Sequence, residues 1–166
     1  MVRNRWSFKL IAFFTASFLV LLVLSRMYSY QLTDFSLRNE GGDYRPITMP
    51  ISEQSQSVSV YEVRGHLTIR RLTTKQFLVI PDDQLLELRI NDVAVDLSKY
   101  PSGALRDYIR GVSINLKNYL EVGQNEVYVR YKDTGGRMGL SILADPKNPF
   151  FIFLALLWTA FVLSAS

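Results

Sequence analysis

Few side chains in this 166-residue sequence have the types and spacing that catalysis needs. His66 is the single histidine and cysteine is absent, so histidine-cluster and cysteine metal sites and thiolate catalysis are excluded. We expect His66 to be exposed or to cap an element. Asp82 and Asp83 are adjacent at the end of a predicted strand and are typical turn formers, whereas a glycosidase needs carboxylates from separate elements. Gly135-Gly136 lacks the spacing of a phosphate loop and predicts a hairpin. We therefore expect no catalytic residue, metal site or cofactor within this chain.

A sugar-binding surface combines an aromatic platform with planar hydrogen-bonding side chains, because a pyranose ring has apolar C–H faces rimmed by hydroxyl groups. Two predicted loops carry such candidates: Tyr100, Asp107, Tyr108 and Arg110 before one strand, and Asp133 and Arg137 after another. The alternative is structural, because tyrosines near sheet edges often pack against arginine stems and Asp107 with Arg110 has the i,i+3 spacing of a helical pair. The sequence leaves both interpretations open.

Two apolar segments flank the region that carries these candidates. Residues 10–25 are uncharged between Lys9 and Arg26, and 16 residues at about 1.5 Å each span about 24 Å, which the flanking cations can extend. We predict a transmembrane helix over 10–26, with a cleaved signal peptide as the alternative. Residues 148–166 carry no charge and predict a second transmembrane helix, with a buried core helix as the alternative.

The basic residues give the predicted first helix an orientation. All 15 acidic residues follow Arg26, so the formal charge of +4 belongs to the N-terminal segment. Three cations precede the apolar segment and Arg26 follows it, which favours a cytoplasmic basic N-terminus at 1–9. Residues 27–147 are then extracytoplasmic, on the outer side of a plasma (inner) membrane. The excess charge lies beside the membrane and not on a folded domain, so we expect no nucleic-acid partner.

Between the two segments the pattern is that of a β domain. Residues 27–56 are polar and interrupted by glycine and proline, and we predict an extended connector there. Residues 57–147 alternate between apolar and polar side chains in several short runs, which is typical of half-buried strands. No long helical pattern separates the runs. The predicted fold class is therefore mainly β, an antiparallel β-sandwich or jelly roll flanked by two transmembrane helices.

Some predictions inside this domain are specific enough to compare with a structure. In the run NEVYVRYK, Val127, Val129 and Tyr131 are expected to point inward. Leu86, Leu88 and Ile90 are expected to alternate with the polar residues between them. Asn91-Asp92 predicts a tight hairpin, because both residue types tolerate positive φ.

The segments LELRINDVAVDL, GVSINLKNYLEVGQNEVYVRYKD and GGRMGLSIL resemble the second half of galactose-binding-like jelly-roll domains, over about 60 residues. In that family a hairpin of the form xLxVNGxxV precedes a stretch reading IDLTxYLxxGxNxLxVxV, and Asn91-Asp92, Gly123 and Asn125 fall on matching positions. The resemblance implies that Gly123 permits a turn and that Asn125 bonds the backbone. Such domains accompany family 2 glycoside hydrolases, the periplasmic subunit of bacterial cellulose synthase and some membrane sensors, so the resemblance implies a fold and points toward carbohydrate.

Three functions follow as hypotheses. The first is a non-catalytic, membrane-anchored extracytoplasmic module that binds glycan or docks onto an envelope glycan-handling membrane enzyme. Its expected partners are the lipid bilayer, a membrane protein or further transmembrane segments, and carbohydrate. The second is the ligand-sensing ectodomain of a membrane receptor. The third is the N-terminal part of a polytopic membrane glycosyltransferase whose catalytic residues lie outside this sequence. The sequence therefore leaves open whether the chain is part of an enzyme.

Overall fold

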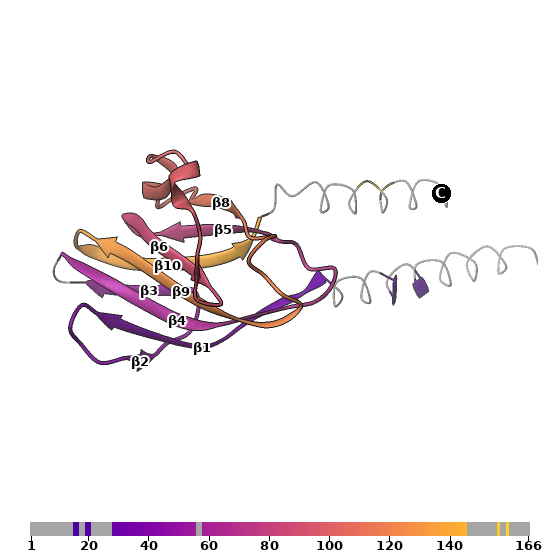
Figure 1. Ribbon diagram of the computed structural model, residues 1–166, viewed down its shortest axis with the longest axis horizontal. Helices are drawn as coiled ribbons and strands as arrows, with labels where there is room; N and C mark the ends of the chain where they lie inside the picture. The colour runs from indigo at the N-terminus through magenta and orange to yellow at the C-terminus, as the bar shows by residue number, and fades with distance from the viewer. Residues whose placement is uncertain are drawn as a thin grey trace, which may run out of the picture.

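The domain is a β-sandwich of two antiparallel sheets (Figure 1). The computed structural model describes residues 15–16, 19–20, 28–55, 58–145, 156 and 159. The predicted mainly-β fold class is confirmed for this part of the chain. Within it, no helix has the length and apolar character needed to cross a membrane. The predicted transmembrane helices, 10–26 and 148–166, fall almost entirely outside the described residues and stay predictions.

Consecutive strands cross between the two sheets. The elements in chain order are β1 (Tyr30–Asn39), β2 (Arg45–Pro46), β3 (Ile51–Ser55), β4 (Ser59–Ile69), β5 (Gln76–Pro81), β6 (Gln84–Ile90), β7 (Val93–Ala94), the short 3-10 helices η1 (Leu97–Lys99) and η2 (Ala104–Arg106), β8 (Val112–Asn115), β9 (Gly123–Asp133) and β10 (Gly136–Ala144). One sheet has the order β2-β1-β4-β9-β6-β7 and the other β3-β10-β5-β8. When the two-residue strands β2 and β7 are left out, successive strands along the chain alternate between the two sheets.

The core lies between the sheets and follows the alternation of the sequence. On β9, Val127, Val129 and Tyr131 are all buried, which confirms their predicted inward orientation. On β6 the prediction for Leu86 is wrong, because this side chain is exposed. The register of β6 against β9 shifts between Leu85 and Glu87, and this irregularity turns Leu85 inward in place of Leu86.

Residues 30–55 belong to the sandwich, which corrects the prediction of a connector over 27–56. β1 pairs with β4 and buries Phe35 and Leu37. β3 pairs with β10 and buries Ile51. The period-two pattern of β1 is interrupted at Asp34, which has a positive φ of 55° where the register shifts. That bulge explains why a simple alternation does not reveal the strand.

Two turns have the residues that their backbone conformations require. Asn91 and Asp92 have φ values of 51° and 62° and join β6 to β7, which confirms the predicted hairpin. Asn125 is fully buried. It accepts from the backbone N–H of Glu121 at 2.7 Å and donates to the carbonyl oxygens of Glu121 and Gly123 at 2.8 and 3.1 Å. Asn125 therefore bonds the backbone of its own turn, as expected.

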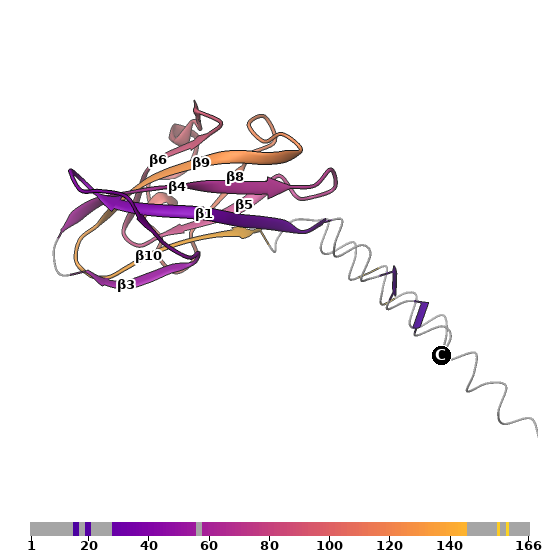
Figure 2. The same cartoon turned by 90° about the horizontal axis from the view of Figure 1, so that it is seen from below.

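Both ends of the described domain lie at one end of the sandwich (Figure 2). The backbone N–H of Ala144, where β10 ends, donates to the hydroxyl of Tyr30, where β1 begins, at 3.3 Å. The register of β10 against β5 pairs Ala144 with Phe77 and Leu140 with Pro81. The β5–β6 loop and the β9–β10 turn consequently lie at the opposite end from the two chain ends.

Candidate functional site

The end of the sandwich far from the chain ends holds a cavity of about 610 Å³. It is lined by Ser52, Asp82, Asp83, Tyr108, Gly135, Arg137, Met138 and Gly139. Tyr108 is 65% exposed and lies in the loop between η2 and β8. Arg137 projects from β10, where its Nε donates to the hydroxyl of Ser52 at 2.8 Å. An aromatic ring and a guanidinium group thus share this cavity with two carboxyl groups.

Three of the six predicted sugar-binding residues belong to this region. Tyr108 and Arg137 line the cavity, and Asp133 is fully buried at the end of β9, beside Asp82 and Asp83. Tyr108 and Arg137 lie in loops that are separate in the sequence, and the packing of the two sheets brings both residues to the same cavity.

The other three predicted residues are not part of the cavity lining. The Tyr100 hydroxyl accepts from the backbone N–H of Asn115 at 3.2 Å, and so holds its loop against β8. The carboxylate of Asp107 accepts from the backbone N–H groups of Ile109 and Arg110 at 3.0 and 2.7 Å. These backbone bonds hold the pKa of Asp107 below its usual value. Tyr100 and Asp107 therefore have structural contacts, and Arg110 is exposed outside the cavity.

Asp82, Asp83 and Asp133 form an acidic cluster beside the cavity. The antiparallel register pairs Gln84 of β6 with Lys132 of β9, so the residues just beyond this pair, Asp83 and Asp133, are neighbours. One carboxylate oxygen from each of the three lies within 4.8 Å of the others. From the sequence alone, Asp82 and Asp83 are predicted to be turn formers. Pairing of β6 with β9, which brings Asp83 beside Asp133, is the signal that would reveal the cluster.

The carboxyl groups of the acidic cluster are bonded to the nearby turn and to one another. Asp133 Oδ1 accepts from the backbone N–H of Gly135 at 2.9 Å, and the Asp133 side chain also hydrogen-bonds with Asp82. Asp83 Oδ2 accepts from the backbone N–H and the hydroxyl of Thr134, the latter at 2.6 Å. Across residues 28–55 and 58–145, no salt bridge reaches any of the three carboxylates.

The charge of this cluster changes the protonation of Asp82. Burial, a hydrogen bond with Asp133 and the charge of Asp83 raise the pKa of Asp82 to about 7. When Asp82 is protonated, its carboxyl group donates a hydrogen bond to Asp133. This proton reduces the repulsion among the three carboxyl groups of the cluster.

A second polar surface occupies the outer face of the six-stranded sheet. A groove of about 490 Å³ lies over β1, β4, β9 and β6. The Arg64 guanidinium lies 5.1 Å from the ring centroid of Tyr44 and 5.5 Å from that of Tyr128. Arg38 lies 4.6 Å from the Tyr44 ring, and Arg89 5.7 Å from the Tyr128 ring. Cations and rings therefore alternate across four elements that are distant in the sequence.

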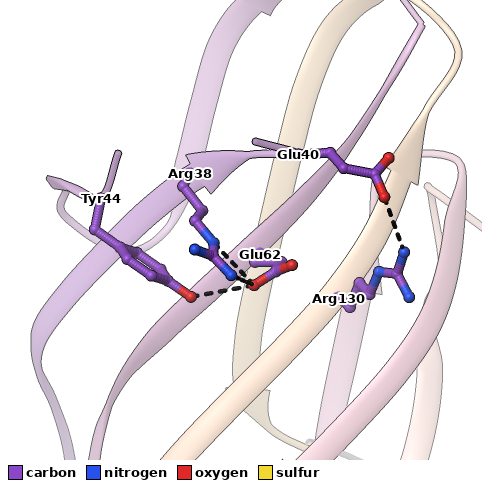
Figure 3. Close-up of polar contacts among 5 residues, drawn as sticks. All are labelled: Arg38, Glu40, Tyr44, Glu62 and Arg130. Atoms are coloured by element: carbon purple, nitrogen blue, oxygen red, sulfur yellow. Dashed lines mark hydrogen bonds and ion pairs between the residues drawn. The ribbon is translucent and has the colours of Figure 1, made fainter. Parts of the chain in front are cut away.

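Glu62 anchors one side of this face (Figure 3). It accepts from Arg38 Nη2 at 2.7 Å and from the Tyr44 hydroxyl at 3.2 Å. Burial raises the pKa of Glu62, but the hydrogen bonds from Arg38 and Tyr44 outweigh burial and hold the pKa below its usual value. Figure 3 also shows Arg130 paired with Glu40 at 3.4 Å. The tyrosine rings here contact guanidinium groups, so they offer less free surface to a sugar than the Tyr108 ring does.

His66 lies in the same groove, on β4. Its Nδ1 is 3.5 Å from a carboxylate oxygen of Asp34, an ion pair when the imidazole is protonated. This surface is not predictable from local sequence patterns, because its residues are contributed by strands that pair over long sequence separations.

Comparison of the chain with protein-family models, with curated proteins and with solved structures finds no match.

Proposed function

We propose that this chain is a non-catalytic, membrane-anchored extracytoplasmic module that binds glycan through the cavity at the free end of its sandwich. The observation that carries the proposal is the exposed ring of Tyr108 beside Arg137, Asp82 and Asp83 in one cavity of about 610 Å³. A pyranose ring stacks its C–H face on an aromatic side chain, and its hydroxyls bond to guanidinium and carboxyl groups. The cavity offers both kinds of contact.

The position of the cavity fits a module held at a membrane surface. Tyr30 and Ala144 contact each other at one end of the sandwich, and the cavity lies at the other end. With the proposed transmembrane helices at 10–26 and 148–166 attached near that first end, the cavity faces away from the bilayer. The proposed location is the plasma (inner) membrane, with a cytoplasmic N-terminus and residues 27–147 outside.

The strand order supports a finer description of the fold. We assign the sandwich to the jelly-roll class with galactose-binding-like character, because successive strands alternate between the sheets and the Gly123–Asn125 turn has the bonds that the resemblance implies. In such a fold, loops at the sandwich ends are free to vary and to bind ligands.

Glycan binding is tested with a glycan array probed by the full chain in lipid nanodiscs. We expect hits that Tyr108→Ala weakens about tenfold. The matched control is Ile109→Ala, which shortens an apolar side chain that is 71% exposed in the same turn and lies outside the cavity lining. Absence of hits on any polysaccharide, or equal weakening by both substitutions, contradicts the proposal.

The orientation is tested by cysteine labelling, because the chain has no cysteine of its own. In intact bacterial cells, a membrane-impermeant maleimide should label Ser102→Cys, an exposed position in the loop before η2. It should leave Ser7→Cys unlabelled until the cells are permeabilised. The reverse pattern contradicts the orientation.

Docking onto an envelope glycan-handling membrane enzyme is a second candidate, and the outer face of the six-stranded sheet favours it. Arg64 stacks between two tyrosine rings and has no salt bridge among the described residues, so its charge is available to a partner. A photo-crosslinking residue at position 64 should give a defined adduct with one membrane protein, and the same residue at the exposed position 106 should not.

A further inference from the structure

We propose that two loops at the chain-end side of the sandwich dock onto anionic lipid headgroups, so that the domain itself contacts the bilayer. The loops are the β4–β5 loop (residues 70–75) and the β8–β9 loop (residues 116–122), and together they are called the basal surface. The inference rests on the membrane anchoring in the proposed function and does not depend on glycan binding. It gives a partner to the end of the sandwich opposite the cavity.

The two loops of the basal surface are joined to each other. The backbone N–H of Leu116 donates to the carbonyl oxygen of Lys75 at 2.7 Å. The antiparallel register of β4 and β9 pairs Ile69 with Gly123, the residues that border the two loops. The loops therefore form one continuous surface at this end of the sandwich.

The basal surface is also bonded to both ends of the described domain. Thr73 Oγ1 donates to the carbonyl oxygen of Ser29 at 2.9 Å, and the backbone N–H of Asp145 donates to the carbonyl oxygen of Gln76 at 3.1 Å. Figure 2 shows the β4–β5 loop beside the start of β1. Ser29 and Asp145 are each three residues from a proposed transmembrane helix. Three residues span at most about 11 Å, and the headgroup region adds about 5–8 Å to each side of the hydrocarbon core, so both connections hold the loops near the headgroups.

The charge of the basal surface complements an anionic membrane. Its loops contain four basic residues and one acidic residue, namely Arg70, Arg71, Lys75, Lys117 and Glu121. None of the four cations forms a salt bridge with the part of the chain that the structure describes. Residues 30–145 contain 14 basic and 15 acidic side chains in total, so the domain as a whole is close to neutral. Positive charge is therefore concentrated at the end that faces the proposed bilayer.

Two exposed apolar side chains lie among these cations. Leu72 is 40% exposed in the β4–β5 loop, and Val122 is 64% exposed at the end of the β8–β9 loop. Apolar side chains are stabilised when they move from water into the boundary between headgroups and acyl chains, and basic side chains are attracted to anionic lipids. The basal surface offers both kinds of contact to a lipid surface.

Fluorescent probes at two exposed valines test the docking, because the chain has no cysteine of its own. Val122→Cys carries the probe on the basal surface, and the matched control Val58→Cys, at a position 63% exposed just before β4, carries it at the cavity end. The full chain is inserted into nanodiscs that contain a lipid with a nitroxide headgroup, with or without anionic phosphatidylglycerol. Phosphatidylglycerol should raise the quenching of the Val122→Cys probe about twofold or more. About 1 M salt, where the screening length is about 3 Å, should remove this rise, and the Val58→Cys probe should not respond.

Removal of charge supplies a second readout. A basic side chain near an anionic surface strengthens binding about fivefold. Arg70→Gln and Arg71→Gln should therefore each lower the ratio of docked to undocked chains, measured from the quenching, about fivefold. Lys132→Gln, at the cavity end of β9, should leave the ratio unchanged. Circular dichroism checks that each variant is folded.

Alkaline carbonate extraction of cell membranes tests the anchoring separately. If the chain stays in the membrane and the Val122→Cys probe does not respond to phosphatidylglycerol, or responds no more than Val58→Cys, the docking is overturned and the anchoring stands. Equal effects of Arg71→Gln and Lys132→Gln also overturn the docking. Release of the chain by carbonate refutes the anchoring, and with it the connections on which the docking depends.

Discussion

The substitution Asp82→Asn should stabilise the domain at pH 8 when divalent cations are removed. Burial, the hydrogen bond with Asp133 and the charge of Asp83 raise the pKa of Asp82 to about 7. A carboxyl whose folded-state pKa is raised favours folding while it is protonated. Its contribution is fully present below the unfolded-state pKa near 3.8 and is lost as the pH rises through about 7. Asparagine keeps the shape and a donor without acquiring charge, so the variant should avoid that loss.

The size of the effect can be bounded from the geometry. A pKa change from 3.8 to about 7 corresponds to at most about 4 kcal/mol, at about 1.4 kcal/mol for each tenfold change. Coulomb repulsion gives the same order, because two charges 4.8 Å apart repel by about 3.5 kcal/mol at an effective dielectric constant of about 20. Asp82 is half-buried, and solvent screening reduces both limits. We expect the parent chain to lose about 1–2 kcal/mol relative to the variant between pH 4 and pH 8.

The assay is urea unfolding of both chains in nanodiscs, followed by far-ultraviolet circular dichroism in the presence of a chelator at pH 4, 6 and 8. A stability difference that is the same at all three pH values would refute the assigned titration.

Three further substitutions test the packing and the buried polar groups by urea unfolding. Asn125→Ala should cost about 3 kcal/mol, because it removes the five hydrogen bonds of 2.7–3.3 Å that this fully buried side chain makes; a cost below 1 kcal/mol would contradict this role. Gly65→Ala should cost about 2 kcal/mol, because its Cβ would lie 2.5 Å from the Phe35 ring. Tyr131→Phe should be neutral or stabilise by about 1 kcal/mol, because the buried hydroxyl has no hydrogen-bond partner among the described residues; a clear loss would show that this hydroxyl is bonded.

Local patterns in the sequence predict the parts of this fold that local physics determines. The inward side chains of β9 follow from strict alternation, and the Asn91-Asp92 hairpin follows from tolerance of positive φ. β1 was not predicted, because its bulge at Asp34 breaks the alternation and its stability comes from pairing with β4. A strand of this kind is stabilised by its pairing with distant strands, and short-range periodicity in the sequence does not contain that information.

The same distinction separates the predicted site from the observed cavity. Tyr108 and Arg137 can be predicted from residue type, which is visible in a sequence. Asp82 and Asp83 join Asp133 through the register of β6 against β9, and a register between distant strands cannot be read from a single sequence. Asp107 has a suitable residue type as well, but its carboxylate accepts hydrogen bonds from the backbone of its own turn.

Titration calorimetry of the strongest array ligand against the full chain in nanodiscs tests the central claim of glycan binding most directly. The three chains to compare are the parent, Tyr108→Phe and Tyr108→Ala. Stacking on the exposed ring predicts that phenylalanine keeps the affinity within about threefold and that alanine lowers it about tenfold, which is about 1.4 kcal/mol. Unchanged affinity in Tyr108→Ala would contradict the assignment of the cavity as the glycan site.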